Sequence, residues 1–169
     1  MQDIRGAARV RATETCNCGL AIDYFTLKTE FDVTLEQVKD YSFNVTFDDQ
    51  LLPHITVDEA TPIGTGGGPS PSMLLASAIG HCLSSSLLFC LQKSRVPAKH
   101  ISTKAHATLA RNETGKWRVQ RLNVNINAEL ANEVDRERMR RCVEIFEDFC
   151  VVTQSVRRGI DVQVAVQTV

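Results

Sequence analysis

The sequence predicts one α+β domain with the element order β-β-(β)-α-β-β-α-β. Three observations lead to this prediction. Apolar and polar residues alternate in several short segments, as they do in half-buried strands. A long uncharged segment, residues 73–91, follows a break rich in glycine and proline. A second, charged segment repeats apolar residues at three- and four-residue steps, as one face of a helix does.

The first elements are predicted to be short strands. Alternation indicates strands at residues 31–36 and 42–47, with a turn at Lys39-Asp40 between them. Residues 55–57 have the same pattern and predict a short third strand.

A long helix is predicted next. Residues 64–69 form the strongest break in the chain, after which Ser70 suits a helix N-cap and Pro71 a first helical residue. The helix is expected to run to Ser94. Its uncharged segment has the length of a membrane span, but serine, glycine and histidine interrupt it, so a buried central helix is expected instead.

A β-hairpin is predicted to follow the helix. Alternating segments at residues 101–109 and 117–126 flank a turn at residues 112–115. The apolar phase flips within the returning strand, which predicts a β-bulge near Gln120-Arg121.

A helix and a strand are predicted to end the chain. Residues 132–150 have the apolar spacing of one amphipathic helix, with Cys150 at its C-terminal end. Residues 160–167 alternate again and predict a final strand.

Composition narrows the function classes. A length of 169 residues fits one domain or one subunit of a dimer. With 19 Lys and Arg against 20 Asp and Glu, the net charge is −1, so no nucleic-acid partner is expected. The first residues lack the apolar core of a secretory signal, and a cytoplasmic location is therefore expected.

The six cysteines lack the regular spacing of a disulfide scaffold. Cysteines eight residues apart on one helix lie about 12 Å apart along its axis, whereas a disulfide needs Cα atoms within about 7 Å. Cys82 therefore cannot bond Cys90 within one helix, and Cys142 cannot bond Cys150. A Cys82–Cys150 bond would require two helices to meet. The simplest interpretation of Cys90 and Cys142 is that they are small buried hydrophobic residues.

Cys82 and Cys150 have different predicted electrostatic settings. Cys82 lies in mid-helix, too far from the N-terminus for the helix dipole to act, and needs a cation from elsewhere to become a thiolate. Cys150 is expected near a helix C-terminus, where partial negative charge opposes thiolate formation. This asymmetry favours Cys82 as the attacking thiol and Cys150 as the resolving thiol.

Other sites are weaker hypotheses. Cys16 and Cys18 could form half of a metal site, but no second Cys/His pair has zinc-site spacing, so they are interpreted as incidental or weakly redox-active thiols. The glycine run at residues 66–68 lacks the Gly-Lys-Ser/Thr of a phosphate-binding loop. No metal or other cofactor is expected.

Two segments resemble the OsmC/Ohr family, named for osmotically inducible protein C and organic hydroperoxide resistance protein. One runs from Gly68-Pro69-Ser70-Pro71 to Cys82, and the other from Cys150-Val151-Val152-Thr153 to Val162. Val57-Asp58-Glu59 is similar to the OsmC-like branch of that family. The resemblance assigns residues 29–169 to an OsmC-like domain and residues 1–28 to an N-terminal extension.

The resemblance implies an intertwined homodimer in which central helices pack between β-sheets. It also implies a thiol peroxidase of the oxidative stress response that reduces organic hydroperoxides or related peroxides. By this match Cys82 is oxidised to a sulfenic acid, Cys150 condenses with it to a disulfide, and a dithiol reductant restores both thiols.

The chain departs from the family pattern around the first cysteine. Peroxidase members have a glutamate at the start of the helix that holds an arginine, whereas residues 70–73 contain no acid. Lys39, Asp58 and Glu59 are the candidates to take the supporting roles of this glutamate and arginine. The alternative interpretation of the two acids is that they are turn residues before Pro62. The alternative function is a small-molecule binding protein on the same scaffold, with weak or no peroxidase activity.

Overall fold

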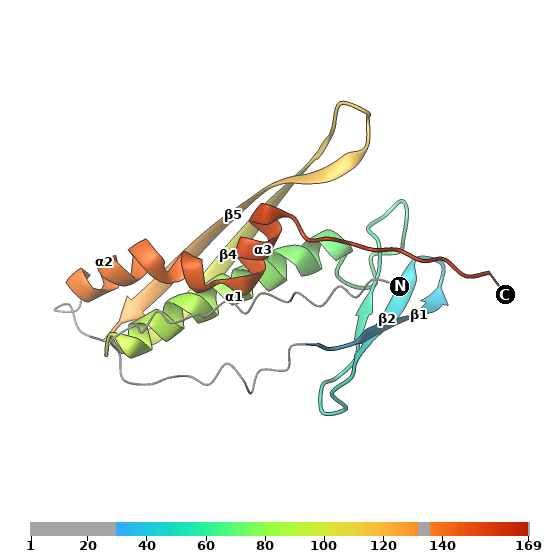
Figure 1. The fold of residues 1–169 in the computed structure, drawn as a ribbon. Helices are drawn as coiled ribbons and strands as arrows, with labels where there is room; N and C mark the ends of the chain where they lie inside the picture. Colours follow the sequence, from blue (N-terminus) through green and yellow to red (C-terminus); the bar gives the residue numbers. More distant parts are fainter. Residues whose placement is uncertain (1–29, 132–135, 169) are drawn as a thin grey trace, which may run out of the picture.

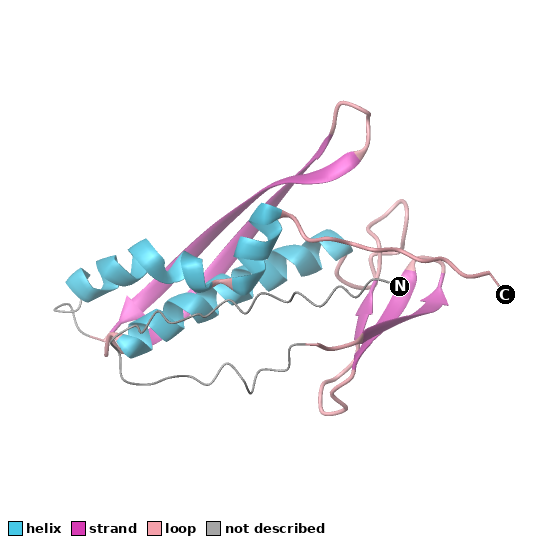
Figure 2. Ribbon diagram, viewed as in Figure 1, coloured by secondary structure: helices cyan, strands magenta, loops and turns pink. Residues whose placement is uncertain are grey.

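The first sheet is a three-stranded antiparallel meander (Figures 1 and 2). The computed structural model describes residues 30–131 and 136–168. Within them, β1 (Val33–Lys39), β2 (Ser42–Phe47) and β3 (Ile55–Val57) confirm the three predicted strands. The first turn lies one residue later than predicted, at Asp40-Tyr41, with Asp40 in the left-handed region at φ 50°.

The helix α1 (Pro71–Lys93) leads from this sheet to the rest of the molecule (Figure 1). Its start is as predicted: the Ser70 side chain caps it by accepting a hydrogen bond of 3.4 Å from the backbone N–H of Met73. Within the described residues, α1 alone is long and apolar enough to span a membrane. Core helices of soluble proteins meet the same criterion, and 44% of its most apolar window is buried inside the chain.

The second sheet is a long hairpin of β4 (Ala98–Arg111) and β5 (Trp117–Leu130). Thr108 pairs with Arg121 and Leu109 pairs with Val119, which leaves Gln120 as the extra residue of the predicted bulge.

One face of the hairpin packs against α1. The two lie close together at Gly80, where an added Cβ would make ordinary van der Waals contact, at 3.6 Å, with side-chain atoms of both Ala105 and Thr103. The Ser84 hydroxyl lies 2.6 Å from that of Thr103 and adds a polar link between helix and strand.

The prediction of one helix over residues 132–150 is wrong. The described part divides into α2 (Arg136–Ile145), the 3₁₀ turn η3 (Phe146–Phe149) and α3 (Val151–Arg158). Cys150 separates the last two with an extended backbone, φ −81° and ψ 97°. Cys150 thus follows the short turn η3 as its C-cap and begins α3 as its N-cap.

The predicted final strand is also absent. Residues 159–168 form no strand with any described part of the chain. Its alternating apolar side chains are largely exposed, with values of 63% for Ile160 and 84% for Val166. Alternation shows only that one face is suited to burial, whereas a strand also needs a hydrogen-bonding partner.

The core lies between α1, the hairpin and the C-terminal helices. Leu91 is 0% exposed and Val96 2% exposed at the end of α1. Apolar residues of one β5 face, including Leu122 and Val124, pack against this cluster. Three of the four described cysteines belong to the same cluster: Cys90, Cys142 and Cys150.

Candidate active site

The helix α3 crosses α1 (Figure 1), and Cys150 at its start is a neighbour of Cys82 on α1. Cys82 is half-buried in the middle of α1, and Cys150 is completely buried at the start of α3. The Cys150 thiol lies close enough to Cys82 to raise the pKa of the Cys82 thiol, although the residues are far apart in the sequence. The fold therefore brings together the two thiols that the sequence paired, and both are reduced.

The N-terminus of α3 points at Cys82. The backbone N–H groups of Val152 and Thr153 lie near its sulfur and act to lower its pKa. First-turn N–H groups have no partner within their own helix, and they carry the positive end of the helix dipole. Cys150 lies at this same end, as the N-cap of α3. The prediction that it lies at the negative end of a helix is wrong.

The pKa of the Cys82 thiol is nevertheless raised. Burial is the largest cause, because it disfavours the charged thiolate, and the hydrogen bond with the Cys150 thiol acts in the same direction. The N–H groups of Val152 and Thr153 oppose these effects by stabilising the thiolate. None of these groups is a cation, so the α3 N-terminus supplies the favourable electrostatics at Cys82.

Thr153 is a site residue that sequence reasoning missed. Its hydroxyl oxygen accepts a hydrogen bond of 3.0 Å from the Cys150 thiol, and its side chain is only 7% exposed. This bond fixes the Cys150 sulfur beside Cys82. Cys150 and Thr153 are the N-cap and the third helical residue of α3, but they are not a capping-box sequence, so no local signal marked this helix start.

Asp58 organises the glycine-rich loop before α1. One carboxylate oxygen accepts hydrogen bonds from the Thr65 hydroxyl at 2.6 Å, the Thr65 N–H at 3.0 Å and the Gly67 N–H at 3.1 Å. The other accepts from the Glu59 N–H at 2.8 Å. The Thr65 hydroxyl is the largest cause of a lowered Asp58 pKa. This geometry supports the turn interpretation of Asp58.

Lys39 and Glu59 lie in the same part of the molecule as Asp58. Lys39 is exposed at the end of β1 and lines a cavity of about 510 Å³ together with Asp58. Glu59 is half-buried and lines a separate cavity with Trp117 and Arg118. Neither Lys39 nor Glu59 is among the groups that shift the pKa of Cys82.

An apolar groove of about 570 Å³ lies beside the thiol pair. Its wall includes Ile79 and Leu83, which flank Cys82 on α1, and Thr153, which accepts the hydrogen bond from Cys150, whereas neither thiol lines it. Polar residues at the groove include Arg157, which forms an ion pair of 2.6 Å with Glu147. The arrangement places a largely apolar groove, which also holds a charged pair, against residues that neighbour the two thiols.

The described residues contain no group of three His, Cys, Asp or Glu side chains that could hold a metal ion. Cys16 and Cys18, the candidate metal or relay thiols, lie outside the described residues, as does the predicted extension at residues 1–28.

A sequence comparison identifies the family. The model of the family described as OsmC-like protein matches residues 64–165, which contain both thiols of the pair. This chain belongs to the OsmC-like family. Members of this OsmC/Ohr family include organic hydroperoxide resistance proteins. No protein of curated function matches the sequence.

Solved structures of OsmC-like proteins share the fold. An OsmC-like protein from Mycoplasma pneumoniae has a TM-score of 0.65 at 14% identity, over 78% of this chain and 89% of that chain. An organic hydroperoxide resistance protein OsmC from Legionella pneumophila gives 0.55 at 18% identity, over 76% and 89%. OhrB of Bacillus subtilis, also an organic hydroperoxide resistance protein, gives 0.54 at 19% identity, over 78% and 93%.

Proposed function

We propose that this OsmC-like protein is a thiol-dependent peroxidase that reduces organic hydroperoxides. The Cys82 thiolate attacks the distal oxygen of ROOH, the O–O bond breaks, and a proton completes the alcohol ROH, which leaves Cys82 as a sulfenic acid. The Cys150 sulfur then attacks the Cys82 sulfur, and water leaves as the disulfide forms. A dithiol reductant takes up the oxidation by exchange and regenerates both thiols.

The contact between Cys82 and Cys150 carries this proposal. A sulfenic acid formed on Cys82 would have its resolving thiol nearby, since the Cys150 thiol already shifts the pKa of Cys82. The α3 N–H groups would stabilise the thiolate and direct Cys82 for attack. Thr153 would hold the resolving sulfur in place until it is needed.

The apolar groove supports an organic substrate. Ile79, Leu83 and Phe146 line it, so an alkyl or aromatic group could lie there with its peroxide oxygens toward Cys82. Hydrogen peroxide has no such group and would gain nothing from the groove. Aromatic and alkyl hydroperoxides are therefore the proposed substrate class.

The test is reduction of cumene hydroperoxide by the full chain with dithiothreitol as the reductant, measured across a pH series. We expect catalytic turnover whose rate rises with pH through the neutral range. The sign follows from the raised pKa of Cys82, because the reactive thiolate is the minor form below that pKa. Cumene hydroperoxide should react faster than hydrogen peroxide. Peroxide loss no faster than with dithiothreitol alone contradicts the proposal.

A second candidate is a small-molecule binding protein with little peroxide chemistry. The raised pKa of Cys82 and the absence of a cation among the groups that shift it favour this candidate. It predicts that an apolar ligand binds in the groove while peroxide leaves the thiols intact. Thiol titration separates the two functions, since the peroxidase loses two thiols for each hydroperoxide reduced.

We also propose a cytoplasmic homodimer. A two-stranded hairpin and the exposed valines of residues 160–168 both lack strands to pack with in the single described chain. A second copy can supply strands for both. Light scattering on the full chain should give twice the mass of 18.8 kDa, and a monomer at micromolar concentration would contradict the dimer.

A further inference from the structure

A second thiol pair joins α1 to α2. Cys90 on α1 is 8% exposed, and Cys142 on α2 is 1% exposed. Both belong to one buried cluster, and Cys142 raises the pKa of Cys90. Ser94 touches both residues: its backbone N–H donates to the Cys90 carbonyl at 2.9 Å, and its hydroxyl lies 3.3 Å from the Cys142 sulfur. This pair takes no part in the proposed peroxidase cycle.

The two thiol pairs connect the same two parts of the chain, α1 and the C-terminal helical segment, at two separate positions; we call Cys82–Cys150 the first rung and Cys90–Cys142 the second rung. Cys90 follows Cys82 by eight residues, and Cys142 precedes Cys150 by eight residues. Because α2 runs antiparallel to α1, the rungs align as Cys82 with Cys150 and Cys90 with Cys142 (Figure 1). Cys82 and Cys90 lie about 12 Å apart along α1, so each thiol has one partner within reach.

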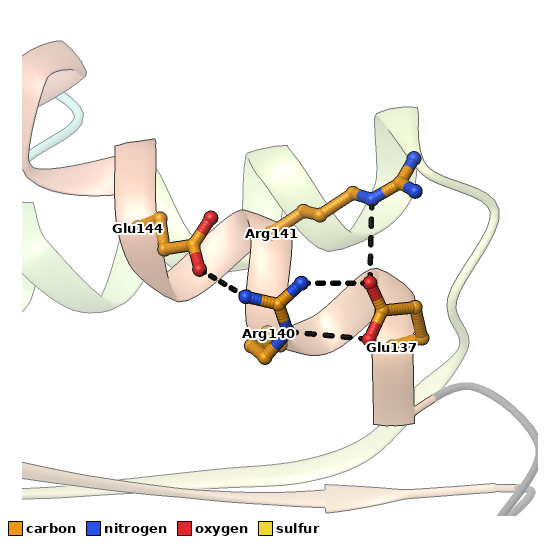
Figure 3. Close-up of polar contacts among 4 residues, drawn as sticks. All are labelled: Glu137, Arg140, Arg141 and Glu144. Carbon is orange, nitrogen blue, oxygen red and sulfur yellow. Dashed lines mark hydrogen bonds and ion pairs between the residues drawn. The ribbon is translucent and has the colours of Figure 1, made fainter.

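The limited packing of α2 allows it to open locally and expose the second rung, Cys90 and Cys142. On its outer face, Arg140 forms ion pairs of 2.8 Å with Glu137 and 2.5 Å with Glu144, all with well-exposed side chains (Figure 3). On its inner face, Cys142 is the one fully buried side chain among the described residues of α2. An element with so little buried surface opens locally at low free energy, which would admit a small reagent to the thiols.

We propose that Cys90 and Cys142 are a second dithiol, which small disulfides of the glutathione type oxidise to a disulfide between α1 and α2. One thiolate of the pair attacks the small disulfide RSSR and releases one RS⁻. The other thiolate then attacks the resulting mixed disulfide and releases the second RS⁻. The two thiols lose two electrons to RSSR, and their two protons pass to the released thiolates.

The chemistry of this rung differs from that of the first. Burial, followed by the hydrogen bond with Cys142, raises the pKa of Cys90 to about 12. A hydrogen-bonding interaction with Ser94 partly offsets this by lowering the Cys90 pKa. The second rung should therefore oxidise slowly at neutral pH and faster as pH rises, independently of hydroperoxide.

A Cys90–Cys142 disulfide would restrain the segment, α2 and η3, that positions Cys150. α2 leads directly through η3 to Cys150, so a bond at Cys142 restrains the approach of that thiol to Cys82. It would also close a loop from Cys90 to Cys142. A loop of this size restrains the unfolded chain, and we expect the melting temperature to rise by about 5–10 °C on oxidation.

The test uses a full chain in which serine replaces Cys16, Cys18, Cys82 and Cys150, so that only the second pair can react. After incubation with oxidised glutathione over a pH series, we expect a loss of two hydrogens in mass and a linked Cys90–Cys142 peptide. Dithiothreitol should reverse both the link and the rise in melting temperature. Adding Cys142→Ser to this variant should leave a glutathione adduct on Cys90 without a link.

The wild-type chain gives a second measurement that does not depend on the folding of the variant. Peptide mapping without reduction, after the same incubation, should again show the Cys90–Cys142 link. Free thiols at both residues, or glutathione adducts without a link, overturn the proposal in either protein.

Discussion

Cys82→Ser is expected to lower the rate of cumene hydroperoxide reduction by about 10³-fold or more. A serine hydroxyl is not ionised at neutral pH and does not attack the O–O bond as a thiolate does. The substitution is nearly isosteric in a half-buried site, so the fold should survive. The measurement is peroxide consumption under saturating dithiothreitol, with circular dichroism to confirm folding.

Cys90→Ser is the matched control. It makes the same sulfur-to-oxygen change on the same helix, eight residues further along, and leaves both Cys82 and Cys150 in place. We expect its activity to remain within about threefold of the wild type. If Cys82→Ser were as active as the wild type, Cys82 would not be the attacking residue. If Cys82→Ser and Cys90→Ser lost the same activity, the loss would reflect a general effect on α1.

Leu91→Ala is expected to destabilise the domain by about 2–5 kcal/mol. Leu91 is 0% exposed and belongs to the cluster that contains Cys90, Cys142 and Cys150. Truncation leaves a cavity between α1 and its neighbours, and the melting temperature should fall by about 5–15 °C. Chemical denaturation measures the free energy of unfolding directly.

Leu51→Ala is the comparison for this loss. Leu51 is 92% exposed, so its truncation removes little buried surface and should change stability by no more than about 0.5 kcal/mol. If both leucine variants lose the same stability, the cluster around Leu91 is not the core of the domain.

Local sequence signals predicted most of the fold. Alternation gave the strands, Ser70 and Pro71 placed the start of α1, and a phase flip located the bulge at Gln120. The break before α3 was missed because the apolar spacing continues through Cys150, although the backbone there is extended. The final strand was wrongly predicted because pairing depends on a partner that alternation does not reveal.

The candidate site was predictable in part. The sequence segments around Cys82 and Cys150 identified both thiols as candidates, and the structure brings them together. The α3 N–H groups were not predictable once Cys150 had been assigned to the wrong end of a helix. Lys39 was proposed as a supporting cation, yet it lies at the first sheet and does not shift the Cys82 pKa.

The central claim is that Cys82 and Cys150 form one redox centre. The most direct measurement adds one equivalent of cumene hydroperoxide to the fully reduced chain, traps the products with acid and maps the peptides without reduction. The account predicts a Cys82–Cys150 disulfide as the main product, with Cys90 and Cys142 still reduced. Unoxidised Cys82, or Cys82 oxidised without a link to Cys150, would contradict it.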